Sequence, residues 1–576
     1  MLFVRKHLFT LALILFFILG FILRFYKLET FPIGFHIDEA SKGYSAYSIL
    51  KTGHDDNGNF LPFYIDIFGD NSPAGYHYSA ILPVALFGLT EFAVRSPGAL
   101  FGALTIIAFY FFAYAIFQNK KISLAAAGIL AISPWHIILS RASSESLLSL
   151  FFILLGFALV FWSLKSQRLT YLITGTVSLS ISFLYYQTPR FFVPLMFFLF
   201  LGFVFFYLRP KISGKFKKVL VSSFLLLVLI DSLLIFGIKG GVGRFTQVNI
   251  FNYPETRLVM EEQIREDGVR NSGALEARFF HNKLVNNAES YLSNYLAYFS
   301  WNFLFLSGLP DWYFVPNMGA LYIVELPFVL YGLIILATHK NRAYRIPLIW
   351  LVAAPLAAAS AIDTNNLQRA IVMFPILDLI AAFGLFEIGS HISKMKYKIL
   401  SLPVKYGILG IFGALFFLNF IYFLHEYFIH TSIHRPWYRN NGFKEMVLDV
   451  KKSYSSYDKI IVTTSAGGIY PEIQFYMQYD PRKYQEEGSP KDKKYSGFGK
   501  FFFVPEECPS LRQTGQFPKA SRTLYINNGT CPSDERYKEV VVRREDGTPA
   551  FKMVYPDQVL LDKAKAREFI DSLHLK

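Results

Sequence analysis

The sequence predicts a mostly helical, polytopic membrane protein that ends in a small α/β domain. Of the 576 residues, 53% are hydrophobic and only 17% are charged, whereas soluble globular chains carry about 25% charged residues. About eleven segments stay apolar for about 17 residues or more, the shortest length that crosses a bilayer as a helix. The composition therefore excludes a disordered chain and a fibrous repeat, and it argues against a purely soluble enzyme.

The expected spans occupy the first three quarters of the chain. They are residues 8–24, 94–117, 123–139, 146–164, 169–186, 191–208, 219–238, 321–338, 346–362, 371–389 and 402–424. The first span follows Arg5 and Lys6 as a signal peptide would. It lacks a small-residue cleavage site, so we expect an anchor. Residues 1–428 are thus predicted to form one transmembrane domain.

Basic residues alternate between the short connections and predict the orientation. Lysine and arginine are concentrated in every second connection, as at 120–121 and 340–345. Such connections remain cytoplasmic in membrane proteins, so the N-terminus is expected on the cytoplasmic side of a plasma membrane. Residues 25–93, 239–320 and 429–576 are then expected outside. This placement explains the net charge of +15 without a nucleic-acid partner.

The pattern changes after residue 428. Residues 442–457 and 472–479 have helical patterns, whereas 459–464 and 499–504 resemble strands. Asp546 and Gly547 lie between two further strand-like segments, which is a hairpin signal. Residues 429–576 are therefore predicted to form an extracytoplasmic α/β domain. Cys508 and Cys531 lack metal-site spacing, but they could form one disulfide in an oxidising compartment.

Two adjacent acids, Asp38 and Glu39, follow the first span closely. Carboxylates near a membrane face are costly unless they are solvated or paired. The ordinary alternative is a helix N-terminus, where acids are stabilised by the helix dipole. Asp70 and His77 belong to the same predicted outer loop. This loop therefore gathers several groups that could bind a substrate or move a proton.

Isolated arginines add to this predicted outer face. They are Arg95, Arg141, Arg190 and Arg369. The planar guanidinium suits bidentate recognition of phosphate, although a single arginine can also be an interfacial anchor. Anchoring does not explain why the acids gather on the same face. We therefore expect a substrate site there, with Asp70, His77, Arg141, Arg190 and Arg369 as binding residues.

Carboxylates and arginines together suit sugar transfer from a lipid phosphate. The phosphate is already a good leaving group, so one carboxylate suffices as general base for an acceptor hydroxyl. Cations can stabilise the departing phosphate, and a carboxylate favours the positive charge that develops on the sugar ring. A single displacement of this kind inverts the anomeric centre. The expected donor is a polyprenyl-phosphate sugar.

Several segments resemble GT-C polytopic glycosyltransferases, in the group that contains protein O-mannosyltransferases and lipid A aminoarabinose transferases (the prokaryotic, family 39-like members). The acidic pair of the first outer loop is one match. The others are residues 72–76, 87–88, 91–99, 133–136 with 140–141, and 317–322 with 325–328. These matches occur in the family's order over roughly residues 30–330. The resemblance implies a GT-C fold and transfer of a sugar from a lipid-linked donor.

The resemblance also implies roles for single residues. Asp38 would be the catalytic base, and Arg95 would pair with the acidic motif through Glu39. Relatives often carry a lysine before the proline of the second motif, where this chain has Asn71 and Ser72. His77, Arg190 and Arg369 are then the candidates for phosphate binding.

A metal ion is left open, and no other cofactor is expected. His36, Asp38, Asp70 and His77 could form a metal site, and a solvated loop is the alternative.

Two alternatives to this activity remain. One is a glycan ligase or polymerase that acts on lipid-linked substrates. The other is a transporter or flippase, which would show two related halves with broken helices at mid-membrane; the sequence shows no such halves. The sequence leaves open which sugar is transferred and whether the acceptor is a protein, a lipid or a glycan.

Overall fold

The chain divides into two compact units. The computed structural model describes residues 2–67, 70–208, 212–241, 249–252, 254–270, 273–394, 402–487, 497–511, 522–533 and 537–559. The transmembrane unit comprises Met1–Leu28, Phe63–Ser79 and Arg95–His430. The C-terminal unit comprises Glu29–Pro62, Ala80–Val94 and Thr431–Lys576. Part of the first predicted outer loop thus belongs to the unit that contains the C-terminal residues.

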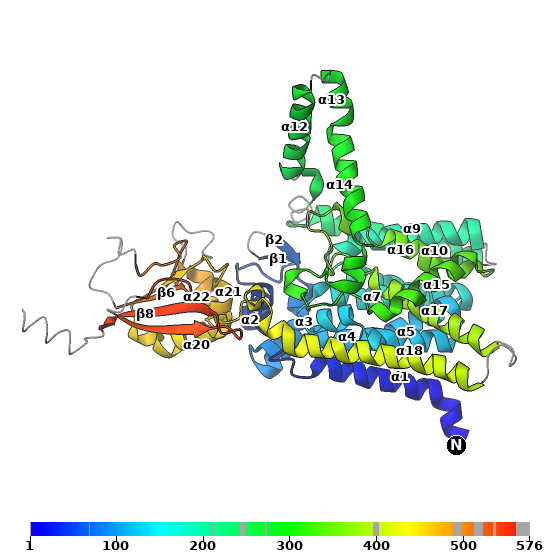
Figure 1. Ribbon diagram of the computed structural model, residues 1–576, viewed down its shortest axis with the longest axis horizontal. Helices are drawn as coiled ribbons and strands as arrows, with labels where there is room; N and C mark the ends of the chain where they lie inside the picture. Colours follow the sequence, from blue (N-terminus) through cyan, green and yellow to red (C-terminus); the bar gives the residue numbers. More distant parts are fainter. Residues whose placement is uncertain are drawn as a thin grey trace, which may run out of the picture. The chain divides into compact units, whose positions relative to one another are not determined.

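Long apolar helices make up the transmembrane unit (Figure 1). Among the described residues, eight helices are long and apolar enough to cross a membrane. They are α1 (Leu2–Phe25), α4 (Glu91–Phe117), α7 (Glu145–Ser166), α9 (Thr188–Gly202) with η1 (Phe203–Leu208), α10 (Gly214–Ser232) with η2 (Leu233–Gly237), η7 (Arg342–Arg345) with α16 (Ile346–Ala353) and η8 (Ala358–Ser360), α17 (Phe374–Lys394), and α18 (Leu402–His425) with η9 (Glu426–His430) and α19 (Thr431–Ile433).

The remaining expected spans are broken or short. Helices α5 (Lys120–Ile132) and α6 (Pro134–Ser140) form one candidate span bent by 57°. The bend follows from Pro134, which cannot donate the backbone hydrogen bond that would continue α5. Helix α8 (Leu169–Ser182) is short, as is the pair η6 (Ile323–Glu325) and α15 (Leu326–Thr338). Each of the predicted segments therefore coincides with a helix, and a multi-pass membrane protein is confirmed.

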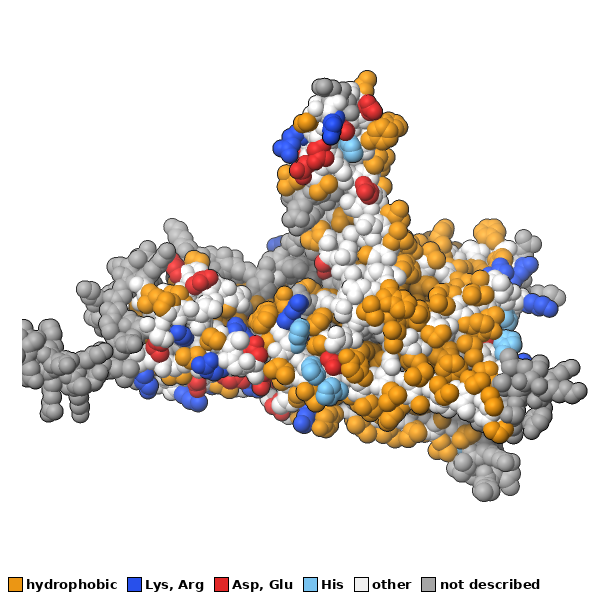
Figure 2. Space-filling view, in the orientation of Figure 1, with side chains coloured by type: hydrophobic (Ala, Val, Ile, Leu, Met, Phe, Trp, Pro, Cys, Tyr) orange, Lys and Arg blue, Asp and Glu red, His pale blue; other side chains and the backbone are white. Residues whose placement is uncertain are grey.

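Aromatic packing and close helix contacts hold this unit together. The Trp350 ring lies 4.9–5.2 Å from the rings of Phe112, Phe157 and Phe192, which come from three other helices. Helices α7 and α8 meet at Gly156, where a Cβ atom would lie 2.7 Å from Leu179. Small residues at such crossings allow close backbone approach, the usual route to stable packing in lipid. Figure 2 shows hydrophobic side chains over most of the visible surface of these helices.

The predicted outer loops of this unit contain short elements. Strands β1 (Tyr64–Ile67) and β2 (Asp70–Pro73) pair antiparallel, and α3 (Gly75–Phe87) follows them. Residues 239–320 contain η3 (Ile250–Asn252), α12 (Pro254–Val269), α13 (Ala274–Phe280), α14 (Lys283–Ala297), η4 (Asn302–Leu306) and η5 (Asp311–Tyr313). Helices α12 to α14 project from the other helices of the unit in Figure 1. The expected location of this segment outside the membrane stays a prediction.

The C-terminal unit is built on a six-stranded mixed sheet. Its strands, in spatial order, are β4 (Gly497–Phe498), β5 (Phe501–Val504), β3 (Lys459–Thr463), β6 (Thr523–Asn528), β8 (Pro549–Val559) and β7 (Tyr537–Arg543). Its helices are α2 (Ile37–Thr52), η10 (Pro436–Arg439), α20 (Phe443–Ser453), η11 (Tyr454–Ser456), α21 (Tyr470–Met477) and α22 (Pro481–Glu487). The predicted α/β region and its β7–β8 hairpin are confirmed. A disulfide joins Cys508 to Cys531, as the sequence allowed.

Helix α2 is part of the core of this unit although it comes from the first predicted outer loop. A Cβ atom at Gly43 would lie 2.6 Å from both Phe475 and Val94, so only glycine allows this approach. Ala40 and Tyr44, on the same helix, are buried with the residues of α20, α21 and the sheet. This packing fixes the start of α2, and therefore Asp38 and Glu39, against the C-terminal part of the chain. The functional division of the chain at residue 428 stays a prediction.

Candidate active site

The acidic pair lies in the first turn of α2. His36 is the N-cap residue: its Nδ1 accepts a hydrogen bond from the Asp38 backbone N–H (3.3 Å), and its own N–H donates to Glu39 Oε2 (3.2 Å). This reciprocal arrangement is a capping box. The ordinary expectation for adjacent acids, a helix N-terminus, is therefore met, and it accounts for where the pair lies.

The two acids differ in environment. The Asp38 side chain is 54% exposed, with a carboxylate oxygen 3.7 Å from His36 Nδ1. The Glu39 side chain is only 4% exposed and binds Arg439 at 2.9 Å. Burial lowers the pKa of His36, although the charge of Asp38 acts in the opposite direction. Glu39 is thus held in a buried ion pair, whereas the Asp38 carboxylate is accessible to solvent.

The segment around Arg439 packs tightly on the acidic motif. A Cβ atom at Gly34 would lie 2.2 Å from the Arg439 carbonyl oxygen, and Gly34 has a φ of +77°. Asn440 also has a left-handed φ, of 55°, and its side-chain amide donates to Glu472 Oε1. Neighbouring residues of η10 and the turn after it therefore bind two different glutamates.

Glu472 is a fully buried carboxyl group on α21. Its Oε2 atom has no hydrogen-bond partner. Burial, with a smaller contribution from the charge of Asp38, raises the pKa of Glu472 to about 8. A neutral Glu472 adds no negative charge near Asp38. Sequence reasoning missed Glu472 and Arg439; the turn-forming residues 440–442 next to Arg439 are a signal that was available but was not used.

Arg141 and Arg95 are both fully buried in the transmembrane unit. Arg141 donates to the carbonyl oxygens of Leu23, Arg24 and Tyr26 at 2.7–3.2 Å. These bonds satisfy the orphan carbonyls at the end of α1. Arg95 donates to the Leu28 carbonyl at 3.3 Å. These contacts give both arginines a structural role, and their roles toward substrate and toward Glu39 stay predictions.

Arg190 is also largely occupied. Its Nε and Nη2 donate to the Phe183 carbonyl at 3.1 and 2.9 Å, and Nη1 donates to the Tyr64 hydroxyl at 2.5 Å. The Tyr64 hydroxyl in turn donates to the Leu234 carbonyl at 2.7 Å. Arg190 therefore links strand β1 to two helices. Arg190 is only 6% exposed, so a phosphate ligand could reach its remaining N–H groups only inside the protein.

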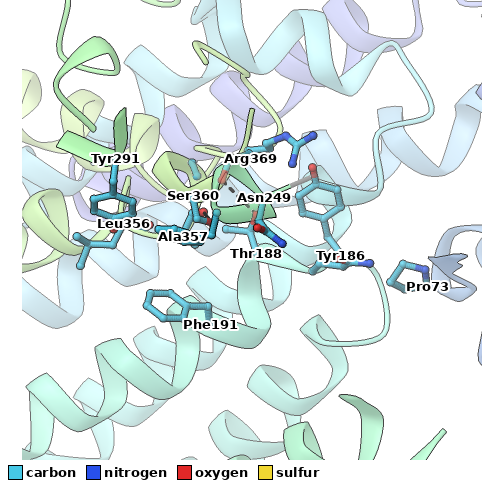
Figure 3. A pocket seen from close by; sticks show the side chains of 14 residues that line it. Pro73, Tyr186, Thr188, Phe191, Asn249, Tyr291, Leu356, Ala357, Ser360 and Arg369 are labelled. Carbon is cyan, nitrogen blue, oxygen red and sulfur yellow. Dashed lines mark hydrogen bonds between the residues drawn. The ribbon is translucent and has the colours of Figure 1, made fainter. Parts of the chain in front are cut away.

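Arg369 lines a cavity of about 290 Å³ in the transmembrane unit (Figure 3). Its guanidinium binds both oxygens of Asp363, at 2.7 and 3.2 Å, and the side chain remains 16% exposed. The cavity walls are mainly apolar. In Figure 3, Leu356 and Tyr291 lie at the opposite end from Tyr186. A charged, paired arginine on an apolar cavity suits a ligand with an anionic head and a hydrocarbon tail.

The predicted site residues are divided between the two units. Asp38 and Glu39 belong to the C-terminal unit, and the other six belong to the transmembrane unit. His77 is fully buried on α3. Asp70 begins β2, where its backbone pairs with Ile67, and its side chain lies outside the described part of the chain. The predicted metal set of His36, Asp38, Asp70 and His77 draws on both units and stays a prediction.

Comparison with known proteins agrees with this architecture. Residues 14–241 match the family model of dolichyl-phosphate-mannose-protein mannosyltransferase. ArnT from Cupriavidus metallidurans in the apo state is a structural match: the TM-score is 0.54 at 13% identity, covering 94% of this chain and 97% of ArnT. The same protein bound to undecaprenyl phosphate matches equally well. No curated protein sequence gives a significant match.

The Archaeoglobus fulgidus oligosaccharyltransferase in its apo form is a second structural match. Its TM-score is 0.52 at 13% identity, over 82% of this chain, which spans 64% of the oligosaccharyltransferase. At such identities the structural matches establish the fold, and the family model adds the N-terminal two fifths of the sequence. Together they show that the chain shares the fold of ArnT and of the oligosaccharyltransferase, as the resemblance implied, and that its N-terminal two fifths are similar to a mannosyltransferase family.

Proposed function

We propose that this protein transfers a sugar from a polyprenyl-phosphate-linked donor to a hydroxyl group of a protein, lipid or glycan acceptor. The transfer inverts the anomeric centre and takes place on the outer face of the plasma membrane. Asp38 is the general base. The observation that carries this proposal is the division of labour in the acidic pair: Glu39 is buried against Arg439, while the Asp38 side chain is 54% exposed.

The position of Asp38 suits a base. A carboxylate can accept the hydroxyl proton only if it reaches within about 2.6–3.2 Å of the acceptor, or through one water. Asp38 is held at the N-terminus of α2, so its backbone is fixed while its oxygens reach solvent. The buried Glu39–Arg439 pair anchors the next residue of the same turn. This rigidity restricts the directions that the Asp38 carboxylate can take.

The donor is assigned to the cavity beside Arg369. A polyprenyl phosphate has one anionic group and a long apolar tail, and the cavity offers a guanidinium and mainly apolar walls. ArnT, which shares the fold, has a structure bound to undecaprenyl phosphate. A departing phosphate is stabilised best by cations placed in advance. Arg190, which binds Tyr64 of strand β1, is the second candidate for stabilising the departing phosphate.

The orientation follows from charge. Basic connections on the opposite side from residues 25–93 and 239–320 keep those loops outside. The acidic motif and the C-terminal unit then lie on the outer face, with the N-terminus in the cytoplasm. A lipid-linked donor and an exported acceptor meet on that face.

Two experiments test the proposal. Mass spectrometry of envelope glycans in wild-type and deletion cells identifies the missing sugar and its acceptor. Purified full-length protein is then given the matching polyprenyl-phosphate sugar, and release of polyprenyl phosphate is measured with acceptor glycosylation. Use of only diphosphate-linked oligosaccharides would instead favour the glycan ligase or polymerase.

Variants of the acidic pair test the base. Asp38→Asn keeps the size of the side chain but cannot take the proton, so transfer should fall at least about 100-fold, the lower range of general-base catalysis. Donor binding should remain near normal. Glu39→Gln should reduce both transfer and stability, because Glu39 would lose its ion pair with Arg439. A well-folded Asp38→Asn protein with near wild-type transfer would remove Asp38 as the base.

A further inference from the structure

Three potential metal ligands meet where α18 ends. His425 is the last residue of α18, and Glu426 and His430 begin and end the π-helical turn η9. One ligand atom from each lies within 4.8 Å of the others. Both histidines are exposed, whereas Glu426 is only 4% exposed. None of these residues lines the cavity beside Arg369.

The spacing of the imidazoles fits a tetrahedral ion. His425 Nε2 and His430 Nε2 are 3.3 Å apart. Two bonds of about 2.0–2.1 Å to one tetrahedral Zn²⁺ place their nitrogen atoms about 3.3 Å from each other. Glu426 can supply a carboxylate oxygen as the third ligand after a small side-chain adjustment. Two histidines and one acid are also a ligand set that zinc uses in proteins.

The π-helical turn is what brings the histidines together. In an α-helix, two residues five positions apart point about 140° away from each other. In a π-helix the hydrogen bonds run from residue i to i+5, so residues at this spacing come to lie over one another. Such turns are uncommon and occur frequently at functional sites. The π-helical backbone of η9 therefore places His425 beside His430, which a regular α-helical end would not do.

We propose that His425, Glu426 and His430 bind a zinc ion, or a similar borderline transition-metal ion, with water in the fourth position. Imidazole ligands select such metals over Mg²⁺ and Ca²⁺, which prefer oxygen. Two imidazoles in direct hydrogen bonding are the simpler explanation of the 3.3 Å distance. That explanation gives no part to the carboxylate of Glu426, and it predicts no metal binding.

The ion would stabilise the turn rather than take part in sugar transfer. Phe428, inside η9, lies with its ring centroid 5.2 Å from the Arg141 guanidinium and packs edge-on against Tyr26. Arg141 holds the end of α1 through the Leu23 and Tyr26 carbonyls. An ion bound at both ends of η9 would hold Phe428 in these contacts. It would also hold the last residues of the transmembrane unit before the chain enters the C-terminal unit at Thr431.

Metal content of the full-length protein tests the proposal. The protein is purified in detergent with an affinity tag that lacks histidine, stripped with a chelator, and dialysed against Zn²⁺. The wild type should retain one equivalent of zinc, and Co²⁺ in its place should give the visible spectrum of a tetrahedral site. His425→Ala and His430→Ala should each weaken zinc binding at least about 10-fold. Removing a residue that only hydrogen-bonds to a metal ligand already costs about that much, and removing a ligand should cost more.

Controls separate this site from other histidines and from unfolding. His391→Ala removes an exposed histidine of α17 that bonds to Tyr331, and it should retain zinc. Added Zn²⁺ should raise the Tm of the wild type and of His391→Ala, because an ion that binds only the folded state stabilises it. The Tm of the two site variants should not respond. Zinc binding that is absent in the wild type, unchanged in His425→Ala and His430→Ala, or matched by Mg²⁺ binding would overturn the proposal.

Discussion

Glu472→Gln should change how the stability of the protein depends on pH. Glu472 is fully buried, and burial raises its pKa from 4.5 to about 8. In the unfolded chain the carboxyl group loses its proton near pH 4.5, whereas in the folded protein it keeps the proton until about pH 8. Between these values the unfolded state binds fewer protons, so stability falls as the pH rises. Below pH 4.5 this loss is absent.

The magnitude follows from the width of this window. Each pH unit between the two pKa values costs about 1.36 kcal/mol, so the wild type loses roughly 3 kcal/mol between pH 4.5 and pH 7. Glutamine has nearly the same shape, can still accept the hydrogen bond from Asn440, and has no proton to lose. The substitution should change the free energy of unfolding at pH 4.5 only by a fixed amount that does not depend on pH. Relative to that amount, the variant should become more stable than the wild type as the pH rises to 7–8.

Thermal unfolding of the full-length protein in detergent measures this difference. Tryptophan fluorescence is followed at pH 5, 6, 7 and 8 for the wild type, Glu472→Gln and Glu445→Gln. Glu445 is an exposed acid on α20 and serves as the matched control. The gap in Tm between Glu472→Gln and the wild type should widen with pH, by about 2–4 °C per kcal/mol for a unit of this size. Parallel curves for all three proteins would refute the reasoning, because they would mean that Glu472 ionises equally in both states.

Three further outcomes are expected. Arg439→Ala should destabilise the protein by about 3–5 kcal/mol, because Glu39 would remain as a buried and unpaired charge; Lys452→Ala, on an exposed residue (side chain 77% exposed), is the control in the same denaturation assay. Arg369→Ala should weaken donor binding more than it lowers Tm, and unchanged donor kinetics would make Arg369 a structural partner of Asp363 alone. Reporter fusions near residue 215 and at residue 430 should report opposite sides of the membrane, and the same side at both points would refute the predicted topology.

Much of the transmembrane fold could be predicted from apolar length alone. Lipid offers no hydrogen bonds to the backbone, so a long apolar segment must become a helix. This is why every expected span coincides with a helix. The bend between α5 and α6 was not predicted, although Pro134 is visible in the sequence, and the shortness of α8 was not predicted either.

The C-terminal unit was predicted less completely. Alternating patterns and the Asp546–Gly547 turn revealed strands and a hairpin. The order of the strands was not predicted, since β3 pairs with β5 and β6 in parallel and both pairings bridge long stretches of sequence. The inclusion of α2 in this unit was also missed. Its evidence in the sequence is a single glycine, Gly43, whose close contact with Phe475 only the structure reveals.

The acidic motif shows why a sequence can suggest a candidate site and still leave the roles of its residues open. Asp38 and Glu39 are consecutive, and consecutive residues of a helix point about 100° apart. One of them can therefore face the core while the other faces solvent, but the sequence does not say which. Arg439, 400 positions away, decides the matter by binding Glu39, and it leaves the accessible position to Asp38. The chemistry of the pair is thus set by a contact with the C-terminal part of the chain.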